Sequence, residues 1–342
     1  MVEQETITED EAALYDRQIR LWGLDAQRRL RSAKVLLAGL RGLGAEVAKN
    51  IVLAGIKSLT LLDDTLVSEE DACSQFLVSR DDVGKNRATC SLSRTQQLNP
   101  MVTVTADTEI LDNKGDDFFS QFDVVCVTCC SQAAMTRISD ICHKKKIQFF
   151  AGDVYGYFGY MFSDLGEHEY VTEVLKPKPK RSDEGSGEPA AKKTRTEERE
   201  TIMVKHSENF VELKDALSVD WTEESNSKKV KKTPSTFFLL QVLLKFIDAE
   251  GRRPSTGSVS TDIETLLKIR DDILDKHKIN KEVLPNDFFS HCFAELSPVC
   301  AVVGGVLGQE IIKAVSKKDQ PHNNFFFYNG VEGSGLVDTI GS

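Results

Sequence analysis

The stretch Val35–Asp63, VLLAGLRGLGAEVAKNIVLAGIKSLTLLD, is the most informative part of this 342-residue chain. An apolar run, Val35–Ala38, leads into a glycine-rich turn. A helix-like segment follows, and a second apolar run, Leu59–Leu62, ends in an acid. This layout is typical of a strand–helix–strand unit that holds phosphates with backbone N–H groups at a helix N-terminus. The stretch therefore predicts a Rossmann-like α/β fold.

The same alternation of apolar runs and helical patterns continues to about residue 151. The runs predict strands at Val35–Ala38, Leu59–Leu62, Val102–Thr105, Val124–Val127 and Ile147–Phe150. The segments between them predict helices at Ala45–Ala54, Lys85–Leu98 and Ser131–Lys144. Such an alternation indicates a doubly wound, largely parallel sheet with helices on both faces.

Both flanks of this unit carry further elements. Thr8 and Glu11 form a capping box that predicts one helix carrying Tyr15, Ile19, Leu21 and Trp22. After Gly152 the pattern alternates like an antiparallel strand over Val154–Phe162, which His168–Val174 could continue. Later helices are expected at Ser235–Asp248, Thr261–Leu274 and Pro298–Val315, and a late strand in Asn323–Gly330.

The region 176–200, KPKPKRSDEGSGEPAAKKTRTEERE, has no apolar periodicity and predicts a disordered linker. We therefore divide the chain into residues 1–175, the first part of one α/β domain, the linker 176–200, and residues 201–342, the remainder of that domain. Two basic clusters in the linker, Lys176–Arg181 and Lys192–Arg195, are read either as a bipartite nuclear import signal or as a solvated linker. The expected location is the nucleus, with the cytoplasm as an alternative.

Composition excludes several classes of protein. A net charge of −10 argues against general nucleic-acid binding. The sequence offers no apolar run of the roughly 20 residues that span a bilayer, and its acidic N-terminus is unlike a signal peptide. The eight cysteines are expected to stay reduced, and Cys126 and Cys129 are read as buried thiols rather than zinc ligands.

Six motifs occur together in order: YDRQIRLWG from Tyr15, VLLAGLRGLGAE from Val35, VGKNRA from Val83, LNP from Leu98, PVCAVVGGVLGQEIIKA from Pro298, and PHNNFFFYNG, which ends at Gly330. Together they resemble the adenylation domains of ubiquitin-like-protein activating enzymes and their bacterial relatives of the ThiF/MoeB type. The length, the linker position and the last motif are similar to the small, non-catalytic subunits of the branch that activates SUMO.

Against that family the nucleotide pocket departs at several positions. The resemblance places Arg41 where the family has a glycine beside the phosphates, and any side chain there costs approach distance. Asp63 is kept, but Thr65 replaces a second acid, Asp71 an asparagine and Ser74 an arginine. An added carboxylate and a lost guanidinium both oppose a triphosphate.

Two further positions of the pocket follow from the same resemblance. The catalytic lysine falls at Arg87, and the magnesium-binding aspartate falls at Cys129–Ser131, where no residue is an acid. We therefore expect no cofactor and no metal in the chain's own pocket, a degenerate site comprising Gly39, Arg41, Gly42, Gly44, Asp63, Thr65, Ser74 and Arg87. Asp63 is read as a turn cap rather than a ribose ligand.

The second chemical step of the family, transfer to a cysteine, lacks its nucleophile. The family carries this cysteine in a domain inserted after the nucleotide fold. Between Cys142 and Cys292 this chain has no cysteine, and Cys73 and Cys90 fall among expected core and helix residues. The isolated chain is therefore expected to be inactive, with a shortened insertion.

The resemblance also implies a positive role for Arg17. At this position the family places a guanidinium that reaches across a dimer interface to the partner's nucleotide, as an arginine finger does. The alternative is a surface cation paired with Asp16 or Glu11. Arg20, one turn further, either supports Arg17 or faces solvent.

The expectation is an accessory subunit of an obligate heterodimer. Its catalytic large subunit would bind ATP and magnesium, adenylate the C-terminus of SUMO, carry the cysteine, and hand SUMO to a conjugating enzyme. The alternatives are the corresponding subunit for another modifier, a pure scaffold, a self-sufficient homodimeric adenylating enzyme, and a nicotinamide-dependent oxidoreductase. The last two lack residues that their chemistry requires.

Overall fold

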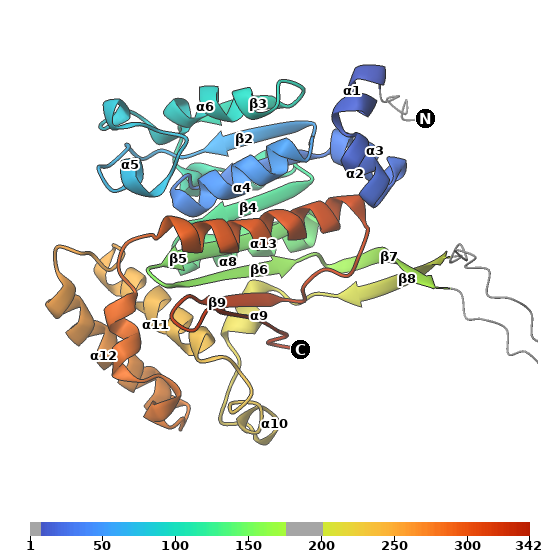
Figure 1. Cartoon of the computed structure of the whole chain (residues 1–342). Helices are drawn as coiled ribbons and strands as arrows, with labels where there is room; N and C mark the ends of the chain where they lie inside the picture. The colour runs from blue at the N-terminus through green and yellow to red at the C-terminus, as the bar shows by residue number, and fades with distance from the viewer. Residues whose placement is uncertain (1–7, 176–200) are drawn as a thin grey trace, which may run out of the picture.

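One eight-stranded sheet organises the computed structural model, which describes residues 8–175 and 201–342 (Figure 1). The strand order is β10-β9-β6-β5-β4-β1-β2-β3. Its strands are β1 (Lys34–Ala38), β2 (Ser58–Leu62), β3 (Thr103–Asp107), β4 (Val124–Thr128), β5 (Gln148–Tyr155), β6 (Phe158–Asp164), β9 (Phe325–Asn329) and β10 (Ser334–Asp338). The first five are parallel and the last three antiparallel, which confirms the predicted fold class.

The central parallel strands β1 and β4 are apolar on both faces. In β1, Val35 and Leu37 pack into the core on one side of the sheet, whereas Leu36 and Ala38 pack into the core on the other side. All five residues of β4 are buried in the same alternating way. Strands buried on both faces require helices above and below, so the apolar runs determine the layered architecture.

The helices divide between these two faces. One face is covered by α4 (Gly42–Leu53) and α13 (Ser297–Ser316), which run side by side in Figure 1, and by α3 (Leu24–Ser32) and α6 (Arg87–Leu98). The opposite face carries α8 (Gln132–Lys145) and α11 (Ser235–Glu250), with α12 (Val259–Lys276) packed on α11. Shorter helices are α5 (Asp71–Ser74), α7 (Asp116–Phe119), α9 (Leu213–Leu217) and α10 (Glu224–Ser227).

The antiparallel strand predicted over Val154–Phe162 is instead a hairpin. Strand β5 continues to Tyr155, the chain turns at Gly156, and β6 returns beside it. Gly156 has a positive φ of 57°, and a Cβ there would lie 2.0 Å from the carbonyl oxygen of His291. The alternating pattern hid the turn because both strands of the hairpin are buried and aromatic.

The segment His168–Val174 does not continue β6 in the main sheet, as the sequence suggested. It belongs to β7 (Glu167–Leu175), which pairs with β8 (Thr201–Asn209) in a separate two-stranded ribbon that projects from the sheet in Figure 1. The predicted linker 176–200, with its basic clusters, lies outside the described residues.

The N-terminal region begins with the predicted capping box, which is confirmed: Thr8 and Glu11 bond reciprocally. The single predicted helix is wrong, because the chain forms α1 (Glu9–Leu14), α2 (Asp16–Trp22) and then α3. Breaks fall at Tyr15, whose ring is buried, and at Gly23, whose φ is 88°. Burial of the Tyr15 ring therefore interrupts the helix at this junction.

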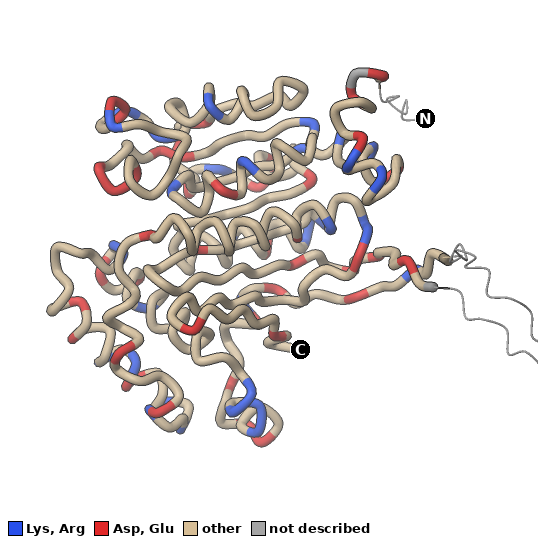
Figure 2. Tube along the Cα trace, viewed as in Figure 1, with Lys and Arg blue, Asp and Glu red and all other residues tan. Residues whose placement is uncertain are grey.

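Helix α13 is the one helix, within the described residues, that is long and apolar enough to cross a membrane. Most of its apolar stretch, 61%, is buried against the rest of the fold, as expected of a core helix. Its tube in Figure 2 is free of charge along the first half, which packs beside α4. By contrast, the basic run Lys228–Lys232 lies in an exposed turn before α11.

Candidate functional site

The altered pocket lies where the parallel strands β1, β2 and β4 end. A cavity of about 390 Å³ opens there. Its walls are the glycine turn after β1, the segments after β2, β3 and β4, the start of α6, and one side chain from the loop after α11. The lining residues include Gly39, Arg41, Asp63, Asp64, Thr65, Arg87, Ile110, Leu111, Asp112, Thr128, Cys129, Cys130, Ser131 and Arg253. The fold has therefore kept a hollow at the place where open α/β sheets bind ligands.

The glycine turn is built by close backbone contacts. Gly39 has a φ of 89°, and a Cβ there would lie 2.2 Å from the carbonyl oxygen of Thr128. A Cβ on Gly44 would lie 2.0 Å from the carbonyl oxygen of Gly39. Arg41, by contrast, has ordinary extended backbone angles, and its half-buried side chain lines the cavity. The turn thus tolerates an arginine at this position, and the cation takes space in the hollow.

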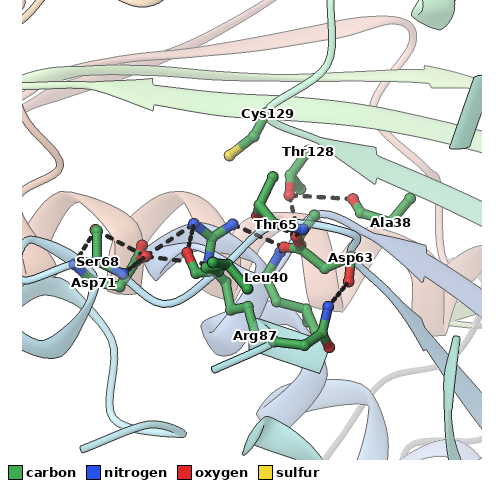
Figure 3. A network of polar contacts seen from close by, with 12 residues as sticks. Ala38, Leu40, Asp63, Thr65, Ser68, Asp71, Arg87, Thr128 and Cys129 are labelled. Atoms are coloured by element: carbon green, nitrogen blue, oxygen red, sulfur yellow. Dashed lines mark hydrogen bonds and ion pairs between the residues drawn. The ribbon is translucent and has the colours of Figure 1, made fainter. Parts of the chain in front are cut away.

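Arg87 lies between two carboxylates (Figure 3). It donates from Nη1 to Asp63 Oδ2 at 2.9 Å and from Nη2 and Nε to Asp71 Oδ2 at 2.8 and 3.2 Å. All three side chains are less than a tenth exposed. Burial opposes the charge of Arg87, but Asp63 and Asp71 outweigh it and raise the pKa of the guanidinium. The cation at the family's lysine position is therefore neutralised by the chain itself.

Both acids are also held by backbone groups. Asp63 accepts from the backbone N–H of Leu40 at 2.8 Å and from the backbone N–H and hydroxyl of Thr65. Asp71 accepts from the backbone N–H and hydroxyl of Ser68. Asp63 therefore caps two turns in addition to its ion pair, which favours the structural interpretation made from the sequence. Ser74 lies on α5, where its carbonyl oxygen accepts from the Ser297 hydroxyl at 3.2 Å.

The N-terminus of α4 is occupied by a carboxylate that the sequence did not indicate. Glu295 Oε2 accepts from the backbone N–H of Gly42, the first residue of α4, at 2.7 Å. Its side chain is 3% exposed, and burial raises the pKa of its carboxyl, although Arg253 acts in the opposite direction. In phosphate-binding loops this N–H end of the helix faces the anion.

Arg253 is the second residue that the sequence did not reveal. Its Nη1 donates to both carboxylate oxygens of Asp153 at 2.7 Å, its Nη2 donates to the Val154 carbonyl oxygen, and its guanidinium lies 4.3 Å from the centre of the Tyr155 ring. Burial opposes its charge, yet Asp153 above all raises its pKa well beyond the ordinary value. No sequence motif signals these contacts, because Asp153 and Arg253 are far apart along the chain.

The expected magnesium position holds a thiol next to two acids. Cys129 Sγ lies 3.8 Å from Asp153 Oδ1 and 3.7 Å from Glu295 Oε1, and its φ is 58°. These three side chains are close enough to share one ion. They do not fit magnesium, because a thiol is a soft ligand and both oxygens of Asp153 already accept from Arg253. Burial raises the pKa of Cys129 well above the ordinary value.

Arg17 and Arg20 lie away from this cavity, on α2, at the end of the sheet where the parallel strands begin (Figure 1). Arg20 is exposed and pairs with Asp16 at 3.0 Å, and Glu11 pairs with Arg31. The alternative in which Arg17 pairs with Asp16 or Glu11 is therefore not the observed arrangement. Arg17 is exposed, and no hydrogen bond or ion pair involves its side chain in the described part of the chain.

The cysteines differ in exposure. Cys73 is exposed on the four-residue helix α5, which corrects the expectation that it lies in the core. Cys90 is half-buried on α6, and burial raises the pKa of its thiol. All eight cysteines are unpaired. Cys126 is buried, as predicted, and Cys129 is partly so.

Comparison with known proteins agrees with this geometry. The model of the ThiF family matches residues 15–340. The chain is 57% identical to SUMO-activating enzyme subunit 1 of Danio rerio, covering 99% of this chain and 98% of the relative. It is 56% identical to the protein of that name from Xenopus laevis, over all of both chains, and 53% identical to that of Homo sapiens, over 100% and 99%. The chain belongs to the ThiF family.

Proposed function

We propose that this chain is the accessory subunit of a heterodimeric SUMO-activating enzyme. The partner subunit binds ATP and magnesium, adenylates the SUMO C-terminus and carries the cysteine that receives the thioester. This chain contributes the dimer surface and a cation to the partner's site. It binds no nucleotide of its own and is inactive alone.

The Arg87 ion pairs are the observation that carries the non-catalytic part of the proposal. A phosphate bound in this pocket would need free donors, and Arg87 already gives three to Asp63 and Asp71. Opening these contacts would leave buried charges without partners, at a cost of several kcal/mol. The added carboxylate of Asp71 also repels a triphosphate.

Arg17 is proposed to act across the dimer interface. It is exposed, it lies remote from the chain's own cavity, and its side chain has no partner among residues 8–175 and 201–342. A delocalised cation held ready in this way can stabilise the charge that develops on phosphate in the partner's site.

The surface around Arg17 supports the interface. Leu14, Leu21, Leu24 and Leu53 are exposed on α1, α2, α3 and α4. Helix α2 packs against α1 and α3, and Gln18 Nε2 of α2 donates to the carbonyl oxygen of Leu53, at the end of α4, at 3.1 Å. An obligate dimer of two such folds would bury roughly 2,000 Å² or more.

Reconstitution tests the proposal. The chain and the large subunit are copurified, and SUMO-dependent ATP–pyrophosphate exchange is measured with wild-type chain, Arg17→Ala and Arg17→Lys. We expect Arg17→Ala to lower exchange by about 10²-fold or more while the heterodimer persists, because one transition-state donor is lost. Arg28→Ala on the neighbouring helix is the matched control and should leave exchange unchanged.

Two results would contradict the proposal. Unchanged exchange with Arg17→Ala would show that Arg17 does not act in the partner's nucleotide site. If the partner's cysteine formed a thioester with ubiquitin rather than with SUMO, the chain would belong to the activating enzyme of another modifier.

Nuclear location is proposed separately, from the two basic clusters of residues 176–200. A fluorescent fusion of the full chain should leave the nucleus when Lys192 and Lys193 are changed to alanine. Unchanged nuclear signal in cells that lack the partner subunit would remove the proposal.

A further inference from the structure

Glu295 occupies the position in which the glycine turn would otherwise hold an external anion. Its Oε2 accepts from the Gly42 N–H at 2.7 Å, so its negative charge lies at the positive end of the twelve-residue helix α4. The contact is tight: a Cβ built on Gly42 would come within 3.0 Å of the same oxygen.

The backbone of Glu295 is fixed independently of that contact. Glu295 forms an isolated β-bridge with Gly156, and the Gly156 N–H donates to the Ala294 carbonyl oxygen at 2.7 Å. The turn between β5 and β6 therefore sets the segment that leads into α13. The backbone contacts of this segment therefore place the Glu295 carboxylate at the N-terminus of α4.

Positive groups surround the carboxylate. Arg253 Nη2 lies 3.8 Å from Glu295 Oε1, and Arg41 also favours the ionised form. Asp153 neutralises much of the charge of Arg253. Glu295 therefore places a negative charge between the helix end and these two arginines.

The occupied position adjoins the open cavity. Cys129 lines the cavity, and its Sγ lies 3.7 Å from Glu295 Oε1. Removal of the carboxylate would therefore extend the cavity of about 390 Å³ to the Gly42 N–H, with Arg41 and Arg253 beside it.

We propose that Glu295 is an internal ligand that closes a phosphate-type anion site at the N-terminus of α4, and that a small polyphosphate binds there once its carboxylate is removed. In the proposed function this pocket binds no nucleotide. Glu295 would be a second reason for this, in addition to the Arg87 ion pairs.

The test uses the full-length chain and inorganic pyrophosphate, with binding measured by calorimetry and by the amide resonance of Gly42. Glu295→Ala should bind pyrophosphate at least about ten-fold more tightly than the wild-type chain, with a shift of the Gly42 amide. Glu295→Gln removes the charge but keeps most of the volume, and should show a smaller gain.

Glu310→Ala is the matched control. Glu310 is also a buried acid, on α13, but it accepts from Lys313 and the His322 N–H, away from the glycine turn. A folded Glu295→Ala chain with no gain over Glu310→Ala overturns the inference. If Glu295→Ala does not fold, the same comparison with Glu295→Gln decides.

These outcomes are independent of the proposed function. ATP–pyrophosphate exchange by the reconstituted pair depends on the partner's site, whereas pyrophosphate binding is measured on this chain without the partner. Failure of one therefore leaves the other standing.

Discussion

At the scale of single residues, Arg87 shows that a cation kept at a given position can be fully engaged by the protein's own acids. The sequence shows a cation at a lysine position, which could suggest a site that still binds phosphate. The structure places it between Asp63 and Asp71, both buried. The free energy of this arrangement depends on all three charges being present, since removal of one leaves another uncompensated.

Replacement of Arg87 should therefore destabilise the fold. We expect Arg87→Met to lower the free energy of unfolding by about 3–5 kcal/mol, because two buried carboxylates lose their cation. Urea denaturation of the full chain measures the change. Lys85→Ala, which breaks an exposed pair with Asp82, is the control and should change stability by less than about 1 kcal/mol. An Arg87→Met effect as small as that of the control would contradict the ion-pair account.

His168, on β7, gives a second residue-scale prediction. It is 4% exposed, its Nε2 has no partner within the described residues, and burial lowers its pKa to about 4. The unfolded chain takes up the proton near pH 6.5, before the folded chain does. The stability due to neutral His168 is therefore present above pH 6.5 and is lost as the pH falls towards 4.

Between pH 7.5 and pH 5 this linkage should cost roughly 2 kcal/mol. We expect the wild-type chain to lose that much more stability over this range than His168→Phe, which keeps a buried ring but cannot titrate. Urea denaturation at the two pH values supplies the comparison. Parallel pH profiles of the two proteins would show that His168 is not buried in its neutral form.

The residues of the pocket differ in how far the sequence could predict them. Asp63, Asp71 and Arg87 lie close together along the chain and in a recognised order, so their proximity could be expected. Arg253 and Glu295 enter the pocket from loops more than a hundred residues away. Only the turn at Gly156 and the packing of α11 and α13 bring them there, and no local pattern encodes that.

At the scale of elements, the contact between α13 and α4 depends on two glycines. A Cβ on Gly304 would lie 2.6 Å from Glu46 Cβ, and one on Gly308 would lie 2.7 Å from Asn50 Cβ. The neighbouring Gly305 faces open space, with no atom within 4 Å of its Cβ position. The close approach lets Asn50 Nδ2 donate to the Gly304 carbonyl oxygen at 3.0 Å.

Alanine substitutions should therefore have opposite effects at adjacent positions. Gly304→Ala should lower the free energy of unfolding by about 1–3 kcal/mol, because the two helices must move apart. Gly305→Ala should raise it by about 0.5–1 kcal/mol, since alanine is the better helix former. Thermal unfolding of the chain without its partner measures both. A stabilising Gly304→Ala would show that the helix pair is looser than described.

The elements that the sequence predicted well are those with a strong local signal. The buried strands and the helices α4, α6, α8 and α11 to α13 were located to within a few residues. The N-terminal helices and the β5–β6 hairpin were not, because their breaks come from tertiary contacts: the buried ring of Tyr15 and the fit of Gly156 against His291. The ribbon strand β8 was missed because most of its residues are exposed.

At the scale of the whole molecule, the two ends of the parallel sheet have different characters. The end where the strands finish carries the cavity with the Arg87 ion pairs. The opposite end carries α1, α2 and α3 with their exposed leucines and Arg17. This arrangement suits the proposed accessory subunit, which would contribute Arg17 to its partner's site.

The leucine surface should therefore control assembly. We expect Leu21→Glu to weaken binding to the large subunit by about ten-fold or more while leaving the chain folded, because a charge replaces an apolar contact. Leu336→Glu on β10, where the leucine is also more than half exposed, is the matched control. Copurification and analytical ultracentrifugation of the reconstituted pair measure the effect. Equal loss with both variants would show that the leucine surface has no special part in assembly.

The ribbon β7–β8 has a practical consequence. Leu175 and Thr201 are paired neighbours, so the chain leaves the fold and re-enters it at one point. Because these two ends are neighbours, a longer insertion between them should add only a small loop-closure cost. A foreign domain whose own ends lie close together could be spliced in there, giving a labelled subunit with both termini left free.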